Sequence, residues 1–156
     1  MLITINDQPI ALGEALDAKA RDTAGLRRTG LWQRLRHGHG PGVVGYEVSN
    51  CLAVCFGGAF DLYPCTHGYL TPDRQWRTDA QVLVRNDLVT NAELRVIDGR
   101  YAASEFVHRF HESCNALLGE ALAVDRYTAR WRNGSAAVTS ILRPDTKNAS
   151  FLFEMV

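Results

Sequence analysis

The 156-residue sequence has no net charge and no hydrophobic run long enough to cross a membrane. Seventeen basic residues balance seventeen acidic residues, so no overall field attracts nucleic acid, anionic lipid or an acidic substrate. The longest apolar stretch, 51–60, is interrupted by glycine, whereas a spanning helix needs about 20 apolar residues in a row. The first seven residues also lack the basic and apolar regions of a signal peptide. We therefore expect a cytoplasmic protein with no membrane partner.

The sequence also lacks the short motifs that carry well-known chemistry. It contains no nucleophile elbow, P-loop, dinucleotide-binding glycine pattern, C-x₂-C or H-E-x-x-H. Its four cysteines occur in a chain that can bury a core without staples, so we expect reduced thiols. Cys51 and Cys55 would lie about 13 Å apart along a strand, too far to pair or to share a metal. We expect them to be small buried apolar residues, and we expect no cofactor.

Composition and periodicity predict one domain, residues 1–156, of the α+β class. Hydrophobic residues make up 46% of the chain and charged residues 22%, as in ordinary globular domains rather than disordered ones. The clearest helix is expected over about 104–121, and shorter N-terminal helices are expected over about 12–24 and 31–37. The apolar stripe that predicts the long helix consists of Phe106, Val107, Phe110, Cys114, Leu117, Leu118 and Ala121.

The remaining segments predict a mainly antiparallel sheet. A hairpin with a turn at Asn6–Asp7 is expected at the start of the chain, and Asp98–Gly99 predicts another. Strands are also expected within 43–56, 82–84, 94–97, 126–132, 136–142 and 150–155. A type I′ turn at Asn133–Gly134 would place Arg132 opposite Ser135. In that register Trp131 points to the core, as do Tyr127, Ala129, Ala136, Val138, Leu142, Phe151, Phe153 and Met155.

Overall neutrality conceals a segregation of charge. Segments 23–46 and 126–144 contain no acidic residue, whereas 87–125 holds seven acids against three arginines. Fifteen of the seventeen basic residues are arginine, whose planar guanidinium suits bidentate contacts with carboxylate or phosphate. Either these segments form a binding surface, or the arginine stems cover an exposed sheet face and pair with the acids of 87–125.

Our hypothesis is a non-enzymatic protein that binds another macromolecule, as a regulator, an adaptor or a toxin-neutralising partner does. We expect a protein partner, because nucleic-acid binding normally brings net positive charge and exposed aromatic residues. A second copy of the chain could pair with an exposed sheet edge to give a homodimer. The expected contact residues on the arginine-rich face are Trp32, Arg34, Arg36, Arg126, Arg130 and Arg132.

The alternative is a small thiol-dependent hydrolase or transferase. Cys65 lies in a polar, loop-like segment with His67 and Asp61, where a base could reach the thiol. The structural alternative there is a half-buried cysteine beside a turn histidine. His37 and His39 could supply two ligands to a metal, but no third ligand follows at a recognised spacing.

Overall fold

A computed structural model describes residues 2–30, 40–55, 60–62, 76–98, 104–143 and 148–156. Within these ranges the fold is mostly β, with twelve strands and two helices, so the expected α+β class is wrong. All strand pairs among the described residues are antiparallel. Neither described helix is long and apolar enough to cross a membrane.

The strands form two sheets. The four-stranded sheet has the order β2-β1-β5-β6, with β2 (Gln8–Ala11), β1 (Leu2–Ile5), β5 (Ala53–Cys55) and β6 (Phe60–Leu62). The eight-stranded sheet has the order β3-β4-β7-β8-β12-β11-β10-β9. Its strands are β3 (Arg27–Arg28), β4 (Val43–Val48), β7 (Trp76–Arg85), β8 (Leu88–Asp98), β12 (Asn148–Met155), β11 (Ala136–Arg143), β10 (Thr128–Asn133) and β9 (Ala123–Val124). The helices are α1 (Ala18–Ala24) and α3 (Ser104–Leu118).

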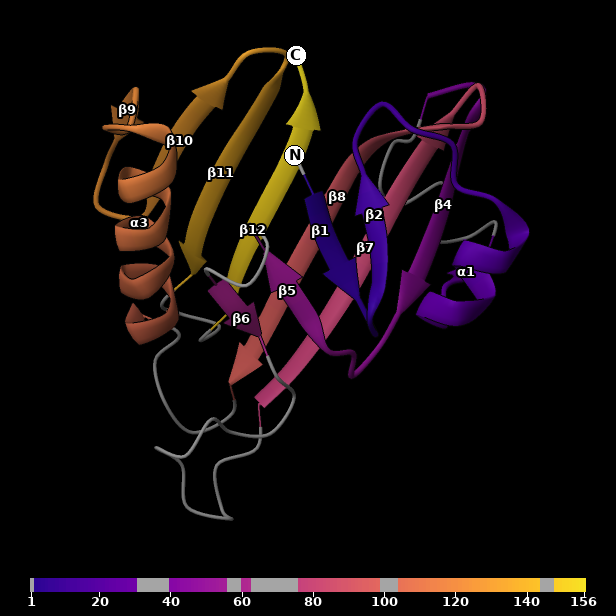
Figure 1. The fold of residues 1–156 in the computed structure, drawn as a ribbon. Helices are drawn as coiled ribbons and strands as arrows, with labels where there is room; N and C mark the ends of the chain where they lie inside the picture. The colour runs from indigo at the N-terminus through magenta and orange to yellow at the C-terminus, as the bar shows by residue number, and fades with distance from the viewer. Residues whose placement is uncertain (1, 31–39, 56–59, 63–75, 99–103, 144–147) are drawn as a thin grey trace.

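The small sheet and α3 lie side by side on one face of the large sheet (Figure 1). The core between these layers includes Ile5 from the small sheet, Phe110 from α3 and Leu94, Trp131 and Phe151 from the large sheet. None of the described helices or strands lies on the opposite face of the large sheet. We call that opposite surface the open face.

The helix expected over 12–24 is present only in its second half. The chain is extended through Ala11 in β2, and α1 begins only at Ala18, after Asp17 has capped it by accepting a hydrogen bond from the Ala20 N–H at 2.7 Å. Gly25 ends the helix as expected, in the left-handed conformation with φ of 72°. Residues 12–17 are not helical, and Leu16 is buried there while its N–H donates to the Asp87 carbonyl at 3.3 Å. The helix expected over 31–37 lies outside the described residues.

Two hairpins turn on the same dipeptide. Asn6 and Asp7 join β1 to β2 with φ of 48° and 65°, as expected, and Asn86 and Asp87 join β7 to β8 with φ of 51° and 65°. Positive φ at both central residues is the mark of a type I′ turn. The second turn was missed because Asn-Asp is a weaker signal than Asn-Gly. The expected Asp98–Gly99 turn extends beyond the described residues.

Helix α3 ends three residues earlier than expected. Gly119 has a φ of 85° and its N–H donates to the Asn115 carbonyl at 3.1 Å, which closes the last turn. Phe110 and Cys114 are fully buried, but Leu117 is 52% exposed, contrary to the predicted stripe. The buried face is rotated toward His111, which packs on the large sheet.

The C-terminal hairpin has a different register from the one predicted. Asn133 pairs with Ala136 and Arg132 with Ala137, so the two-residue turn is Gly134–Ser135. Only Gly134 has a positive φ, which fits a type II′ turn with glycine first rather than type I′. Because the partners shift by two residues, the faces are preserved, and the buried positions of Trp131, Ala129, Val138, Phe151 and Phe153 are confirmed. Tyr127 and Met155, expected in the core, are exposed.

Candidate functional site

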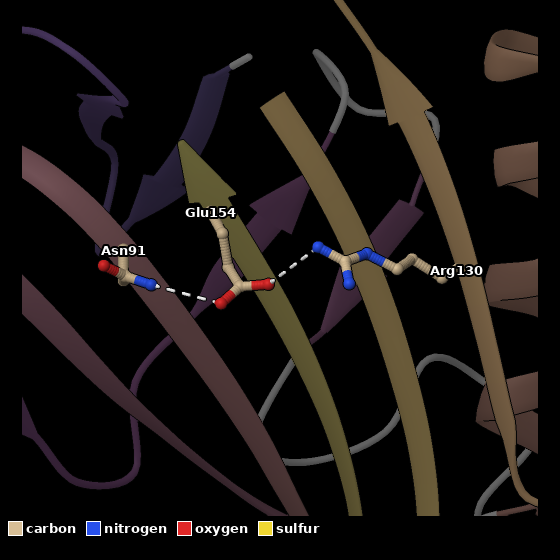
Figure 2. Close-up of polar contacts among 3 residues, drawn as sticks. All are labelled: Asn91, Arg130 and Glu154. Atoms are coloured by element: carbon tan, nitrogen blue, oxygen red, sulfur yellow. Dashed lines mark hydrogen bonds and ion pairs between the residues drawn. The ribbon is translucent and has the colours of Figure 1, made fainter. Parts of the chain in front are cut away.

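The arginines predicted on β10 lie on the open face. Trp131 and Phe153 point into the core, so their neighbours Arg130, Arg132 and Glu154 project to the other side of the sheet. Figure 2 views the sheet from this side and shows Arg130 extending from β10 across β11 toward Glu154 on β12. The exposure predicted for Arg130 and Arg132 is therefore confirmed.

Asn91, Glu154 and Arg130 form a polar chain across the open face. The Arg130 Nη2 lies 3.7 Å from the Glu154 Oε2, and the Asn91 Nδ2 donates to the Glu154 Oε1 at 3.4 Å. Charge-assisted hydrogen bonds are usually about 2.7–2.9 Å, so both contacts are long. The two charged side chains are also 49% and 29% exposed. Arg130 therefore keeps most of its five N–H donors available to water or a partner.

Arg132 and Arg126 complete the described part of the arginine-rich face. Arg132 is exposed and forms no ion pair with a described carboxylate. The Arg126 guanidinium lies 5.3 Å from the centre of the Tyr127 ring, close enough for a cation–π contact. Of these three arginines only Arg130 has a carboxylate from the described residues beside it. The charges of Arg126 and Arg132 are thus not neutralised by a described acid.

Most of the other predicted site residues lie outside the described part of the chain. These residues are Trp32, Arg34, Arg36, His37, His39, Cys65 and His67. Asp61 lies in β6, but its side chain is not described. The structure therefore brings together only Arg130 and Arg132, two residues apart on one strand. Among the described residues no group of three His, Cys, Asp or Glu side chains is placed to hold a metal ion.

The described cysteines are structural. Cys51, Cys55 and Cys114 form no disulfide and have no exposed surface, which confirms the prediction for Cys51 and Cys55. Burial raises the pKa of the Cys51 thiol to about 11 and the pKa of the Cys114 thiol to about 12. These two groups remain protonated thiols at neutral pH, so neither is an activated nucleophile.

A serine–histidine pair that the sequence did not reveal joins α3 to β11. The His111 Nε2 and the Ser140 Oγ are 2.5 Å apart, and the His111 ring lies edge-on to Trp131 with 5.0 Å between ring centres. Ser140 is 0% exposed, so its hydroxyl cannot reach a substrate. Burial lowers the pKa of His111, with a further lowering from nearby His108. The pair therefore anchors the helix to the sheet through a neutral hydrogen bond.

Comparison with known proteins adds nothing to this geometry. No protein family, curated protein or solved structure matches the chain.

Glu154 and Asn91 are the open-face residues that the sequence analysis missed. The alternation that buries Phe151 and Phe153 could have placed Glu154 on this face, but its nearness to Arg130 depends on the order of the strands.

Proposed function

We propose that the protein binds another protein through the open face of its large sheet, with Arg130 and Arg132 as the main contacts. The observation that carries the proposal is the exposure of these two arginines on a broad sheet face that no described element covers. The role is that of a regulator, an adaptor or a toxin-neutralising partner, and it requires no catalytic residue.

The positions of the two arginines favour an acidic partner. Residues two apart on a strand lie about 7 Å from each other and point the same way. Arg132 has no described counter-ion, and the long contact between Arg130 and Glu154 leaves donors unused. A partner that presents two carboxylates at similar spacing can satisfy both guanidinium groups, and complementary charge also speeds encounter.

The described sheet edges favour binding through the face rather than through an edge. The large sheet ends in β3 and β9, which have only two residues each. In β2, at one edge of the small sheet, Pro9 has no N–H and its carbonyl accepts a hydrogen bond from the Gln8 side chain at 3.1 Å. Short or proline-containing edges are poor templates for strand addition. A homodimer formed by edge pairing is therefore the less favoured arrangement.

Charge reversal provides the test. We compare the double variant Arg130→Glu/Arg132→Glu with Arg27→Glu/Arg28→Glu, a matched reversal about 29 Å away at the opposite edge of the same sheet. Affinity purification from cells that express the protein, with quantitative mass spectrometry, should show a partner retained by the wild type and by the control. The β10 variant should lose that partner while keeping the wild-type melting temperature. Equal recovery of every partner by a folded β10 variant would refute the proposal.

We also propose that the protein acts in the cytoplasm. Three buried cysteines of the described residues form no disulfide, as in proteins of a reducing compartment. Fractionation of the expressing cells tests this location, and recovery of the native protein only from an oxidising compartment would contradict it.

A further inference from the structure

A cavity of about 410 Å³ opens where β4, β7 and β8 meet the end of β12. A β-bulge lies at this point, because Leu83 pairs with Asn91 but Val84 pairs with Val89, which leaves Thr90 without an opposite residue. Bulges redirect side chains and are common beside binding sites. The cavity is lined by apolar Val43, Leu83 and Met155 and by polar Arg85, Thr90 and Asn91. Its volume suits a small ligand.

One side of the cavity has apolar side-chain surface that is exposed to water. Val43 is buried, but Leu83 is only half-buried and Met155 is 46% exposed at the end of β12. The Met155 side chain leaves the sheet on the same side as Phe153, and its Sδ lies 3.5 Å from the position of a Cβ at Gly13. Leu83 therefore provides the apolar surface that a ligand beside Asn91 can cover. Contact with a short aliphatic chain would remove this surface from water, which favours binding.

The polar side offers one cation and one free acceptor. Arg85 is exposed, has no ion pair with a described carboxylate, and places its Nη2 3.7 Å from the position of a Cβ at Gly40, another lining residue. The Thr90 hydroxyl donates to the Leu83 carbonyl at 3.3 Å. The Asn91 Nδ2 donates to Glu154, so its Oδ1 points the other way and accepts no hydrogen bond from a described residue (Figure 2).

We propose that this cavity binds a small zwitterion with an aliphatic chain, the chemistry of the aliphatic amino acids. The ligand carboxylate pairs with the Arg85 guanidinium, and the chain packs on Leu83. The ammonium group donates to the Asn91 Oδ1. Glu154 lies next to Asn91, and its negative charge favours an ammonium over a neutral donor and disfavours a phosphate dianion. Neither Arg130 nor Arg132 lines this cavity, although Glu154 contacts both Asn91 and Arg130.

Three probes that differ by single groups test the ligand class. L-leucine carries all three features, 4-methylpentanoate lacks the ammonium group, and 3-methylbutylamine lacks the carboxylate. In titrations followed by amide chemical shifts, leucine should bind saturably with a Kd on the order of 1 mM. Each analogue should bind at least about tenfold more weakly, because it loses one charged contact.

A substitution of Arg85 tests whether leucine binds in this cavity. Arg85→Gln should weaken leucine binding about tenfold or more, while Arg28→Gln, which changes an exposed arginine on edge strand β3, should leave it unchanged. Melting temperatures confirm that both variants are folded. The proposal is overturned if the wild type does not bind leucine saturably, if either analogue binds as well as leucine, or if Arg85→Gln binds it normally. Loss of leucine binding would not affect recovery of a partner through β10, so the two proposals fail separately.

Discussion

Arg130 reaches Glu154 by crossing an entire strand. The two residues belong to β10 and β12, which are separated by β11, and their Nη2 and Oε2 atoms lie 3.7 Å apart. On β11 the residue opposite Glu154 is Ala137, which is fully buried although it points to the open face. A small residue at this position lets the long side chains pass above the strand. The β11 residue opposite Arg130 is Thr139, so the Arg130 side chain crosses β11 diagonally to reach Glu154.

We expect this ion pair to contribute little to stability. In a double-mutant cycle of Arg130→Ala and Glu154→Ala, the coupling energy should be below about 0.5 kcal/mol, because both groups are partly exposed and the contact is long. Urea unfolding at low and high salt measures it. A coupling above about 1.5 kcal/mol would show that Arg130 is held too firmly to serve a partner.

Two substitutions on α3 test which of its faces is buried. The Phe110 ring packs against Phe151 with 4.1 Å between ring centres and is fully buried, so Phe110→Ala should cost about 3–5 kcal/mol of unfolding free energy. Leu117 is half exposed, so Leu117→Ala should change stability by no more than about 0.5 kcal/mol. Urea denaturation compares them. Similar losses from both would mean that the stripe expected from the sequence was right.

The stability of the protein should depend on pH through His111. Burial lowers the pKa of this histidine in the folded state, so below its ordinary value of 6.5 the unfolded chain binds a proton that the folded chain does not. The unfolding free energy should therefore be highest above pH 6.5 and fall as the pH drops below it. His111→Gln should be less stable at neutral pH and show a shallower decline. Parallel stability profiles for wild type and variant would contradict this.

The two Asn-Asp turns should tolerate glycine at their second position. Asp7 and Asp87 both have a φ of 65°, a conformation that costs an L residue energy and glycine almost none. Asp7→Gly and Asp87→Gly should each raise the unfolding free energy by up to about 1 kcal/mol. Thermal and urea unfolding measure the gain, and Asp87→Val is the control that should destabilise. A loss of stability in both glycine variants would mean that the aspartate side chains stabilise the turns.

The cysteines differ in expected reactivity. At pH 8 the buried thiols Cys51 and Cys114 remain protonated because their pKa values are about 11 and 12, so they should react with a thiol reagent only when the protein opens. The thiol-enzyme alternative requires Cys65, which lies outside the described residues, to react faster than the other three. In a Cys65→Ala variant, only Cys51, Cys55 and Cys114 can react with the reagent. Rapid labelling of this variant would contradict their burial.

Local patterns predicted the parts of the fold that depend on local geometry. Alternation along the C-terminal strands placed Trp131 and Phe151 in the core, and Asn6–Asp7 correctly predicted the first hairpin. The division into two sheets was not predictable in this way, because it depends on pairings between distant segments such as β1 with β5. The first half of the helix expected over 12–24 was wrong for a similar reason, because tertiary contacts bury Leu16 without a helix.

The candidate site was predicted in part. The alternation of buried and exposed residues along β10 was sufficient to predict that Arg130 and Arg132 are exposed. Their proximity to Glu154 could not be predicted without the strand order. The cavity at Arg85 required the bulge at Thr90, and no residue pattern in β7 or β8 indicated it. The contact between His111 and Ser140 required α3 to dock on β11.

The position of β12 constrains how the chain assembles. It is made after every other described strand, yet it lies in the interior of the large sheet, between β8 and β11. Ala149 pairs with Val96 across the whole intervening stretch of α3, β9, β10 and β11. Such distant pairings give a high contact order, which slows folding. On the ribosome, the two halves of this sheet must therefore wait for the last described strand to emerge before they can join.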